Sequence, residues 1–374
     1  MTALPSRPSN AQLRASASPG ELRVVAVSDG VLLDYAISRP GAPDGVGDRI
    51  RGRVVAHLPA MAGAFVALPD GIEGFLPDSH GAAVLGVVLG VGDAVTVCIT
   101  RAAQGGKGPR LTARTPQTGP GPPELLTRGP DALARLQALH PDAPVFVDDP
   151  AAAIPGATIV RGGWDEALDA AVADLATPML DLPGGLRASI HPTPALVAID
   201  LDGGASSSER RAKAGAQREA NRAALPALAH AIRLRNLSGA IVLDLAGMAV
   251  KARAALAPDL VAALAPDPLH PRFLGFTALG LAEILRPRIY PPLHEVLSGP
   301  HAAALRALRH LAREAAADPA TPLRLRTAPD VARALDGDPA ARTDLTRRTG
   351  RALVVVSDPA CPPGRWTLES IPRG

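Results

Sequence analysis

The chain has 374 residues, of which 47% are hydrophobic and 20% are charged, and its formal net charge is +3. This composition is typical of a globular protein with a buried core and excludes a disordered chain, and no apolar run is long enough to cross a membrane. Two cysteines are too few for a disulfide framework or a four-cysteine zinc site within one chain, and the small positive charge permits a nucleic-acid partner without requiring one.

The N-terminal region begins with a polar stretch rich in Pro and Ser. Residues 1–20 lack the apolar centre of a signal peptide, so we expect a frayed tail and a cytoplasmic protein. Apolar residues at 22–27 and 31–33 lie on either side of an Asp29-Gly30 turn, which predicts a β-hairpin.

Short strands separated by turns are predicted between residues 48 and 112. The candidates cover residues 50–57, 62–68, 74–76 and 94–100. Glycine separates nearly all of them, and short strands at this spacing are typical of a small β-barrel.

Helices and strands alternate after a linker rich in Pro and Gly at residues 115–123. The helices expected are 125–139, 164–175, 218–235 and 301–317, with the start of another at 279–285, and the strands expected are 144–147, 186–190, 195–201, 240–245 and 271–276. The C-terminal region then has the pattern of a strand at 323–325, helices at 331–335 and 340–346, and a strand at 352–356. This alternation predicts an α/β or α+β region.

Two stretches in and after the predicted barrel stand out: residues 52–78 read GRVVAHLPAMAGAFVALPDGIEGFLPD, and residues 105–112 read GGKGPRLT. The first resembles an S1 RNA-binding domain, which is an OB-type barrel, and the second is similar to the KGxxLT segment after the S1 strands of the ribonuclease E/G family. We expect Phe65 and Phe75 on neighbouring strands of one face, where exposed rings stack on unpaired bases. Lys107 would then place a charge for phosphate beside them. The plainer interpretation is that both Phe side chains belong to the core.

The resemblance to the ribonuclease E/G family continues along the chain in the family's order. Residues 182–185 (LPGG) and 193–204 (TPALVAIDLDGG) resemble LPSGG…TEALTAIDVNSG, Asn221 with residues 232–244 (IRLRNLSGAIVLD) resembles N…QLRLRNLGGIIIID, and residues 279–288 (LGLAEILRPR) resemble GLxExxRxR. The resemblance implies a multidomain α+β and α/β fold. Its parts would be an S1 barrel at 47–114 inserted in an RNase H-like subdomain at 21–46 and 121–185, a DNase I-like catalytic subdomain at 186–298 and a C-terminal α/β region at 299–374.

The family resemblance implies an endoribonuclease that acts on single-stranded RNA in RNA processing or decay. A 5′-end sensor usually follows the S1 domain, but here the chain passes from Thr112 directly to the linker, so we expect the sensor to be missing. The family also shares zinc across a dimer through Cys-Pro-x-Cys, whereas Cys361 has no second cysteine nearby. We therefore expect no zinc-linked dimer, and the oligomeric state is left open.

Asp200 and Asp244 each follow an apolar strand. If these strands are neighbours, both carboxylates emerge at one edge of a sheet and suit a Mg²⁺ ion that keeps several waters and activates one of them at a phosphodiester. Spacing alone favours a plainer interpretation, in which both residues cap turns, but the family motif around both favours a catalytic, metal-binding role. Asp202 lies two residues further on the same face. The family usually has Asn there to orient the attacking water, so Asp202 would either do the same as a hydrogen-bond acceptor or become a third ligand.

Several residues depart from the family pattern or allow two interpretations. Gly247 stands where the family commonly has an acid, and Pro194 replaces the usual Glu. Arg286 and Arg288 follow the GLAE segment and either contact RNA phosphate or complement the end of a helix. The alternative to an active nuclease is a weakened or inactive RNA-binding relative, which Asp202 and Gly247 favour. The motifs around both aspartates argue against a ribosome-associated S1 protein without nuclease ancestry.

Overall fold

The structure is a computed structural model that describes residues 10–86, 89–116, 121–149, 152, 154–203 and 210–371. It divides the chain into two compact units. Unit 1 contains Ala170–Leu293, and unit 2 contains Ser9–Asp169 together with His294–Gly374. No helix among the described residues is both long and apolar enough to span a bilayer.

The first part of unit 2 is a five-stranded sheet in the order β11-β10-β1-β2-β3. Its elements are β1 (Gln12–Ser18), β2 (Glu21–Ser28), β3 (Val31–Ser38), α2 (Ala132–Leu139), β10 (Val145–Val147) and β11 (Thr158–Ile159). The predicted hairpin is confirmed as β2 and β3, whose Asp29-Gly30 turn has φ values of 49° and 75°. Leu133 and Leu136 of α2 pack on the core of this sheet.

Two expectations for this sheet are wrong. β1 lies within the stretch expected to be a frayed tail, and its Leu13 and Ala15 are fully buried. Residues 1–9 of that stretch lie outside the described residues. Only the second half of the expected helix at 125–139 is helical, because Gly129 and Pro130 interrupt it and the residues before them form a strand.

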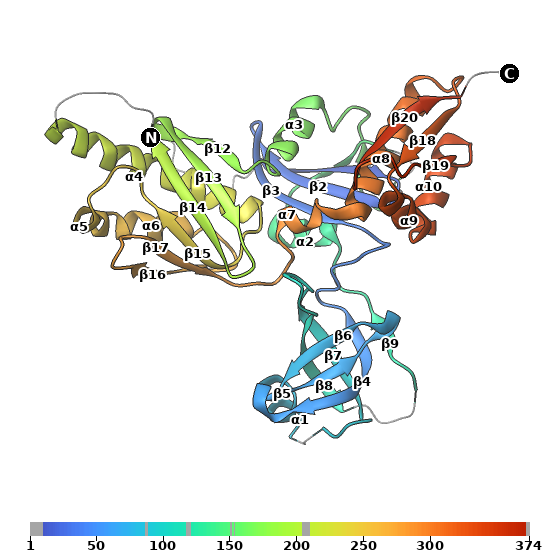
Figure 1. The fold of residues 1–374 in the computed structure, drawn as a ribbon, viewed down its shortest axis with the longest axis horizontal. Coiled ribbons are helices and arrows are strands. Elements are labelled where there is room, and N and C mark those ends of the chain that lie inside the picture. Colours follow the sequence, from blue (N-terminus) through green and yellow to red (C-terminus); the bar gives the residue numbers. More distant parts are fainter. Residues whose placement is uncertain are drawn as a thin grey trace. The chain divides into compact units, whose positions relative to one another are not determined.

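In the sequence, the barrel lies between β3 and α2. It is therefore an insertion into the part of the chain that forms the five-stranded sheet (Figure 1). Strands β5, β6, β8, β7 and β4 are paired in this order, and a β4–β5 pairing closes the barrel. Its elements are β4 (Arg49–Leu58), β5 (Gly63–Ala67), β6 (Glu73–Pro77), α1 (Ala82–Leu85), β7 (Ala94–Arg101), β8 (Arg110–Pro116) and β9 (Glu124–Thr127). The four strands predicted from the sequence are confirmed. β9 pairs with β4, although its residues were expected to belong to the neighbouring subdomain.

The C-terminal part of unit 2 is a three-stranded sheet with helices. Its elements are α8 (Gly299–Ala317), β18 (Leu323–Thr327), α9 (Pro329–Asp336), α10 (Pro339–Thr349), β19 (Val355–Ser357) and β20 (Trp366–Ser370). The predicted order of strand, helix, helix and strand is confirmed, and β20 is an additional strand antiparallel to β18. Glu21 of β2 is buried and accepts hydrogen bonds from Arg39 and from Arg309 of α8.

Unit 1 contains a six-stranded sheet in the order β12-β13-β14-β15-β17-β16. Its elements are β12 (Met179–Leu182), β13 (Leu186–Pro192), β14 (Leu196–Gly203), α4 (Arg210–Leu234), β15 (Gly239–Asp244), α5 (Val250–Arg253), α6 (Ala257–Leu264), β16 (Arg272–Phe276) and β17 (Ala282–Arg286); α3 (Glu166–Asp174) and α7 (Leu293–Val296) lie where the chain passes between the units. Strands β14 and β15 are parallel, whereas the other neighbours are antiparallel. Helices α4 and α6 lie on one face of the sheet (Figure 1), and their apolar side chains belong to its core.

The segment 279–285 was expected to begin a helix and forms β17 instead. Ala282, Ile284 and Arg286 are buried, whereas Glu283 and Leu285 are exposed. This alternation has the period of two that belongs to a strand, and the sheet provides neighbours on both sides through β15 and β16.

Candidate functional site

Asp200 and Asp244 face each other across neighbouring parallel strands. The register of β14 and β15 pairs Ile199 with Leu243 and Asp200 with Asp244. Paired residues of adjacent strands point to the same face and lie about 4.8 Å apart along the direction of hydrogen bonding. The expectation that both strands are neighbours is therefore confirmed, and the two carboxylates lie side by side.

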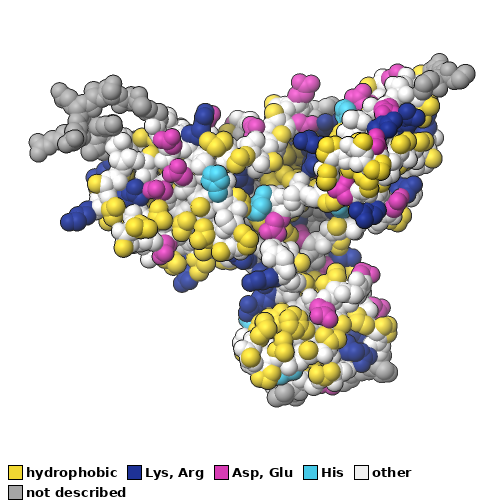
Figure 2. All heavy atoms as spheres, in the orientation of Figure 1, with side chains coloured by type: hydrophobic (Ala, Val, Ile, Leu, Met, Phe, Trp, Pro, Cys, Tyr) yellow, Lys and Arg dark blue, Asp and Glu magenta, His cyan; other side chains and the backbone are white. Residues whose placement is uncertain are grey.

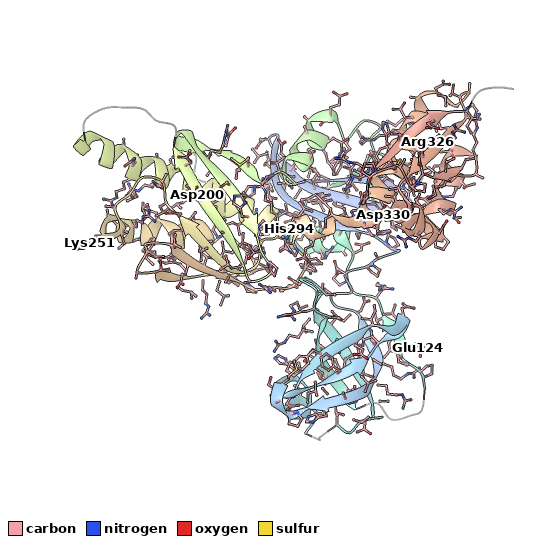
Figure 3. All side chains as sticks on the ribbon, viewed as in Figure 1. Glu124, Asp200, Lys251, His294, Arg326 and Asp330 are labelled. Atoms are coloured by element: carbon pink, nitrogen blue, oxygen red, sulfur yellow. The ribbon has the colours of Figure 1, made fainter. Side chains whose placement is uncertain are left out.

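The two aspartates project from the face of the sheet opposite α4 and α6. Along β14, Val197, Ile199 and Leu201 are buried, and Asp200 and Asp202 are exposed on the other side. Figure 3 labels Asp200 on β14, and Figure 2 shows acidic side chains over β13 and β14 beside hydrophobic ones over β15, β16 and β17. We call this surface the open face; on β13 it carries Arg187, Ser189 and His191.

Arg253 of α5 binds Asp244, a contact that the sequence did not indicate. Its Nη1 donates to Asp244 Oδ1 at 2.5 Å and to the backbone oxygen of Gly280 at 2.9 Å, while its Nε donates to the backbone oxygen of Met248 at 3.1 Å. The Arg253 side chain is only 11% exposed, compared with 46% for Asp244. Arg253 therefore fixes the orientation of the Asp244 carboxylate. It binds Oδ1 and leaves the second carboxylate oxygen, Oδ2, of this partly exposed side chain for another partner.

Asn221 of α4 holds the turn that follows β15. It is fully buried, and its Oδ1 accepts from the backbone N–H of Ala246 at 3.0 Å while its Nδ2 donates to the backbone oxygens of Ala246 and Gln217. These hydrogen bonds satisfy buried polar groups on both elements. Asn221 belongs to a motif recognised in the sequence, and the structure shows that it ties helix and turn together directly after Asp244.

The position expected to be acidic in the family is built differently here. Gly247 has a φ of +61°, a left-handed conformation that favours glycine. A Cβ atom at this position would overlap the amide group of Gln217, which occupies this space. The turn that lacks the acid therefore has a left-handed backbone at Gly247 and the Gln217 side chain in the space of a larger residue.

Asp202 lies in register with Arg187 on the adjacent strand β13. Arg187 also pairs in register with Asp181 of β12, and its Nε donates to Asp181 Oδ1 at 2.7 Å. This hydrogen bond raises the pKa of the Arg187 guanidinium above its ordinary value. The substitution of Asp for the usual Asn is therefore matched by a positive charge directly opposite.

Arg286 and Arg288 do not lie beside the aspartates. Arg286 is buried, and its guanidinium donates to Asp267, to Asn236 Oδ1 and to the backbone oxygen of Leu237. These internal contacts argue against the expected contact between Arg286 and RNA phosphate. Arg288 packs against Gly239 at the start of β15. Asp244 lies five positions further along the strand than Gly239, a distance of roughly 17 Å.

The residues at the open face fit a magnesium ion that keeps most of its water. Among the described residues, no group of three or more His, Cys, Asp or Glu could hold a metal ion. Asp200 and Asp244 offer hard carboxylate oxygens from rigid strands, and Mg²⁺ is commonly bound through one or two carboxylates together with water. Asp202 lies one position further along the same face.

Phe65 and Phe75 form a pair on the outside of the barrel. They are register partners on β5 and β6, and their ring centroids lie 5.6 Å apart at an interplanar angle of 61°. Both rings are half-buried, whereas Ala64, Val66 and Leu76 point inward to the core. The two rings are therefore neighbours on one face, as the sequence predicted.

One basic side chain lies beside the Phe pair, and another lies in the turn that precedes β8. Arg110 of β8 is in register with Phe75 and is half-buried. Lys107 is exposed in the turn before β8, where its backbone pairs with that of Gln104. The barrel surface thus combines two rings with two cations, and Arg110 is a residue that the sequence analysis did not select for this surface.

Comparisons with known proteins match the part of the chain that contains the two aspartates. The Ribonuclease E/G family model matches residues 165–289. Ribonuclease E of Nostoc sp. is 31% identical over 130 residues, which are 34% of this chain and 19% of that protein. Ribonuclease E of Synechocystis sp. is 29% identical over 134 residues, which are 36% of this chain and 20% of that protein.

The region matched by the family model includes the strands of Asp200 and Asp244 and the helix of Asn221. Each match to a curated relative spans about a fifth of that relative's length. Residues 165–289 of this chain are therefore similar to the ribonuclease E/G family.

Proposed function

We propose that this protein is a Mg²⁺-dependent endoribonuclease of the ribonuclease E/G type that hydrolyses single-stranded RNA. The observation that carries the proposal is the register of Asp200 with Asp244 within the segment matched by the family. Both carboxylates would hold the ion through their oxygens. When bound, the ion supplies an activated water and neutralises charge that develops on the phosphodiester.

The protein's own groups position these ligands and the substrate. Arg253 holds one oxygen of Asp244 and leaves the other for the ion. Asn221 keeps the following turn in place through its bonds to Ala246. Asp202 accepts a hydrogen bond from a water near the phosphodiester and so orients it. A rigid arrangement of this kind lowers the cost of bringing the reacting groups together.

The remaining assignments of the proposal follow the family. The five-stranded sheet with its inserted barrel would be the RNase H-like subdomain with an S1 domain, and the six-stranded sheet would be the DNase I-like subdomain. The 5′-end sensor would be absent, since β8 ends at Pro116 and β9, which belongs to the same barrel sheet, begins at Glu124. We also propose a cytoplasmic location and a protein without a zinc-linked dimer.

The second candidate is an RNA-binding relative with weakened or no catalysis. Gly247, covered by Gln217, favours it, because one acid of the family pattern is missing from the turn after Asp244. Asp202 favours it as well, since an ionised carboxylate cannot donate a hydrogen bond as an Asn side chain can.

Cleavage that depends on metal distinguishes the two candidates. The purified chain with an A/U-rich single-stranded RNA and Mg²⁺ should give internal cleavage products, and excess EDTA should abolish them, because the aspartates alone do not activate water. RNA with a 5′ monophosphate and RNA with a 5′ triphosphate should be cleaved at similar rates if the sensor is absent. Binding without cleavage at any Mg²⁺ concentration would support the inactive relative instead.

The Phe pair provides a prediction for RNA binding. Phe65→Ala or Phe75→Ala should weaken binding of single-stranded RNA by about 1–3 kcal/mol, the usual loss when a ring that stacks on a base is removed. Fluorescence anisotropy in EDTA measures this without cleavage. Ile72→Ala removes another exposed apolar side chain of the barrel and serves as the control. Equal losses in all three variants would show that the Phe rings have no special role.

A further inference from the structure

Charged side chains form a row across three strands of the open face. Asp181 on β12 pairs in register with Arg187 on β13, and Arg187 pairs with Asp202 on β14. The adjacent row on the same face contains Ser189, Asp200 and Asp244. The two rows are separated by two residues along each strand, which is about 6.6 Å. Arg187 therefore lies one row from the aspartate pair.

The Arg187 side chain is available to a ligand. It is 60% exposed, and its partner Asp181 is 79% exposed. Within the described part of the chain, its hydrogen bond uses only Nε, and neither terminal amino group, Nη1 or Nη2, has a partner. A guanidinium held at Nε presents a fixed pair of N–H donors, which matches the geometry of a phosphate group.

The acidic side chains of the open face oppose the approach of RNA, and a cation beside the aspartate pair would offset this repulsion. Asp181, Asp200, Asp202 and Asp244 lie in the two rows and repel an RNA backbone. Arg253 is nearly enclosed and committed to Asp244 and two backbone oxygens, so it offers little to a ligand. Arg187 is the exposed cation within these two rows.

We propose that Arg187 binds a backbone phosphate of the substrate RNA, beside the phosphodiester that lies at Asp200 and Asp244, and that Asp181 and Asp202 hold its guanidinium between them. This inference rests on the proposed function, in that RNA is the substrate and the aspartate pair is the site of cleavage. It also assigns Asp202 a second role, which is to hold the Arg187 guanidinium from the opposite strand. Asp202 stands where the family usually has a neutral side chain.

The alternative is that Arg187 and Asp181 only stabilise the β12–β13 hairpin through an exposed ion pair. Such pairs contribute little to stability. If the alternative holds, Arg187→Gln and Asp181→Asn break the same pair and have the same consequences. If Arg187 binds phosphate, the two variants differ, because Asp181→Asn keeps the cation.

The test measures binding of a fluorescent single-stranded A/U-rich RNA in EDTA over a series of salt concentrations. Arg187→Gln should weaken binding roughly tenfold at low salt and reduce the slope of log affinity against log salt by about 0.7. Arg187→Lys should keep the slope and lose part of the affinity, because the point charge remains and the two-donor fork does not. Asp181→Asn should bind at least as well as the parent protein.

Arg222→Gln is the matched control. Arg222 is an exposed arginine of α4, on the covered side of the same sheet, and it pairs with Glu219 and Asp259. Unchanged affinity and slope in Arg187→Gln, or equal losses in Arg187→Gln and Arg222→Gln, would overturn the inference. Cleavage with Mg²⁺ is scored separately: a parent protein that never cleaves contradicts the proposed function, whereas a parent that cleaves together with an Arg187→Gln variant that binds normally contradicts only this inference.

Discussion

An Asp244→Asn variant is expected to cleave single-stranded RNA about a thousandfold more slowly than the parent protein, equivalent to about 4 kcal/mol of transition-state stabilisation. Asn has nearly the same size as Asp, but it lacks the negative charge that would hold Mg²⁺ and that accepts from Arg253. Asp200→Asn should have a similar effect, because the two residues are register partners. Single-turnover cleavage rates over a range of Mg²⁺ concentrations measure both losses.

Asp259→Asn is the matched control for these variants. Asp259 is a partly buried acid of α6 that pairs with Arg222 on the covered side of the same sheet. Its replacement should leave the cleavage rate within about twofold of the parent value, because an ion pair of this kind contributes little. Parent-like cleavage by Asp244→Asn, or an equal loss in Asp259→Asn, would contradict the assignment of the metal site.

An Arg286→Met variant is expected to lower the free energy of unfolding by about 3–5 kcal/mol, the usual cost of leaving a buried charge unpaired. The side chains of Arg286 and Asp267 are only 3% and 6% exposed, and Arg286 Nε lies 2.7 Å from Asp267 Oδ2. Removal of the guanidinium leaves Asp267 without its partner. Urea unfolding followed by circular dichroism gives the size of the effect.

Two further variants test the explanation for Arg286. Arg288→Gln should cost less than about 1 kcal/mol, because this side chain is half-exposed and most surface substitutions have small effects. The double variant Arg286→Met with Asp267→Leu should recover much of the lost stability, since it leaves no unpaired charge. An Arg286→Met protein with parent-like stability and weakened RNA binding would restore the phosphate-binding role suggested by the sequence.

The pair of aspartates could be predicted because two local patterns agreed. Each residue ends an apolar run, and such runs become buried strands whose ends lie at one edge when the strands are parallel neighbours. β14 and β15 meet this condition. The family motif supported the same residues, so both sources of information pointed to one edge of one sheet.

Arg253 could not be found in the same way. It lies in a short helix after the turn, and its contacts to Asp244, Met248 and Gly280 form only when three chain segments come together. No spacing in an arginine-rich sequence distinguishes such a residue. The same limit applies to Arg187, whose importance depends on cross-strand register.

The incorrect elements have a different origin. β1 is composed largely of small and polar residues (QLRASAS), so its alternation of buried and exposed positions is weak in the sequence. β17 is a segment of only five residues (AEILR), and over so short a length periodicity alone does not distinguish a strand from a helix. In both cases the neighbouring strands, rather than the local sequence, determine the structure.

The left-handed turn at Gly247 has a consequence for which side chains this position accepts. Asp is one of the few side chains that visit this backbone conformation, and the Gln217 amide that covers the position is the far end of a flexible side chain. An Asp at position 247 therefore needs a rotation of Gln217 and not a new loop. The turn could hold a carboxylate beside Asp244 while the strand and the hydrogen bonds of Asn221 stay as they are.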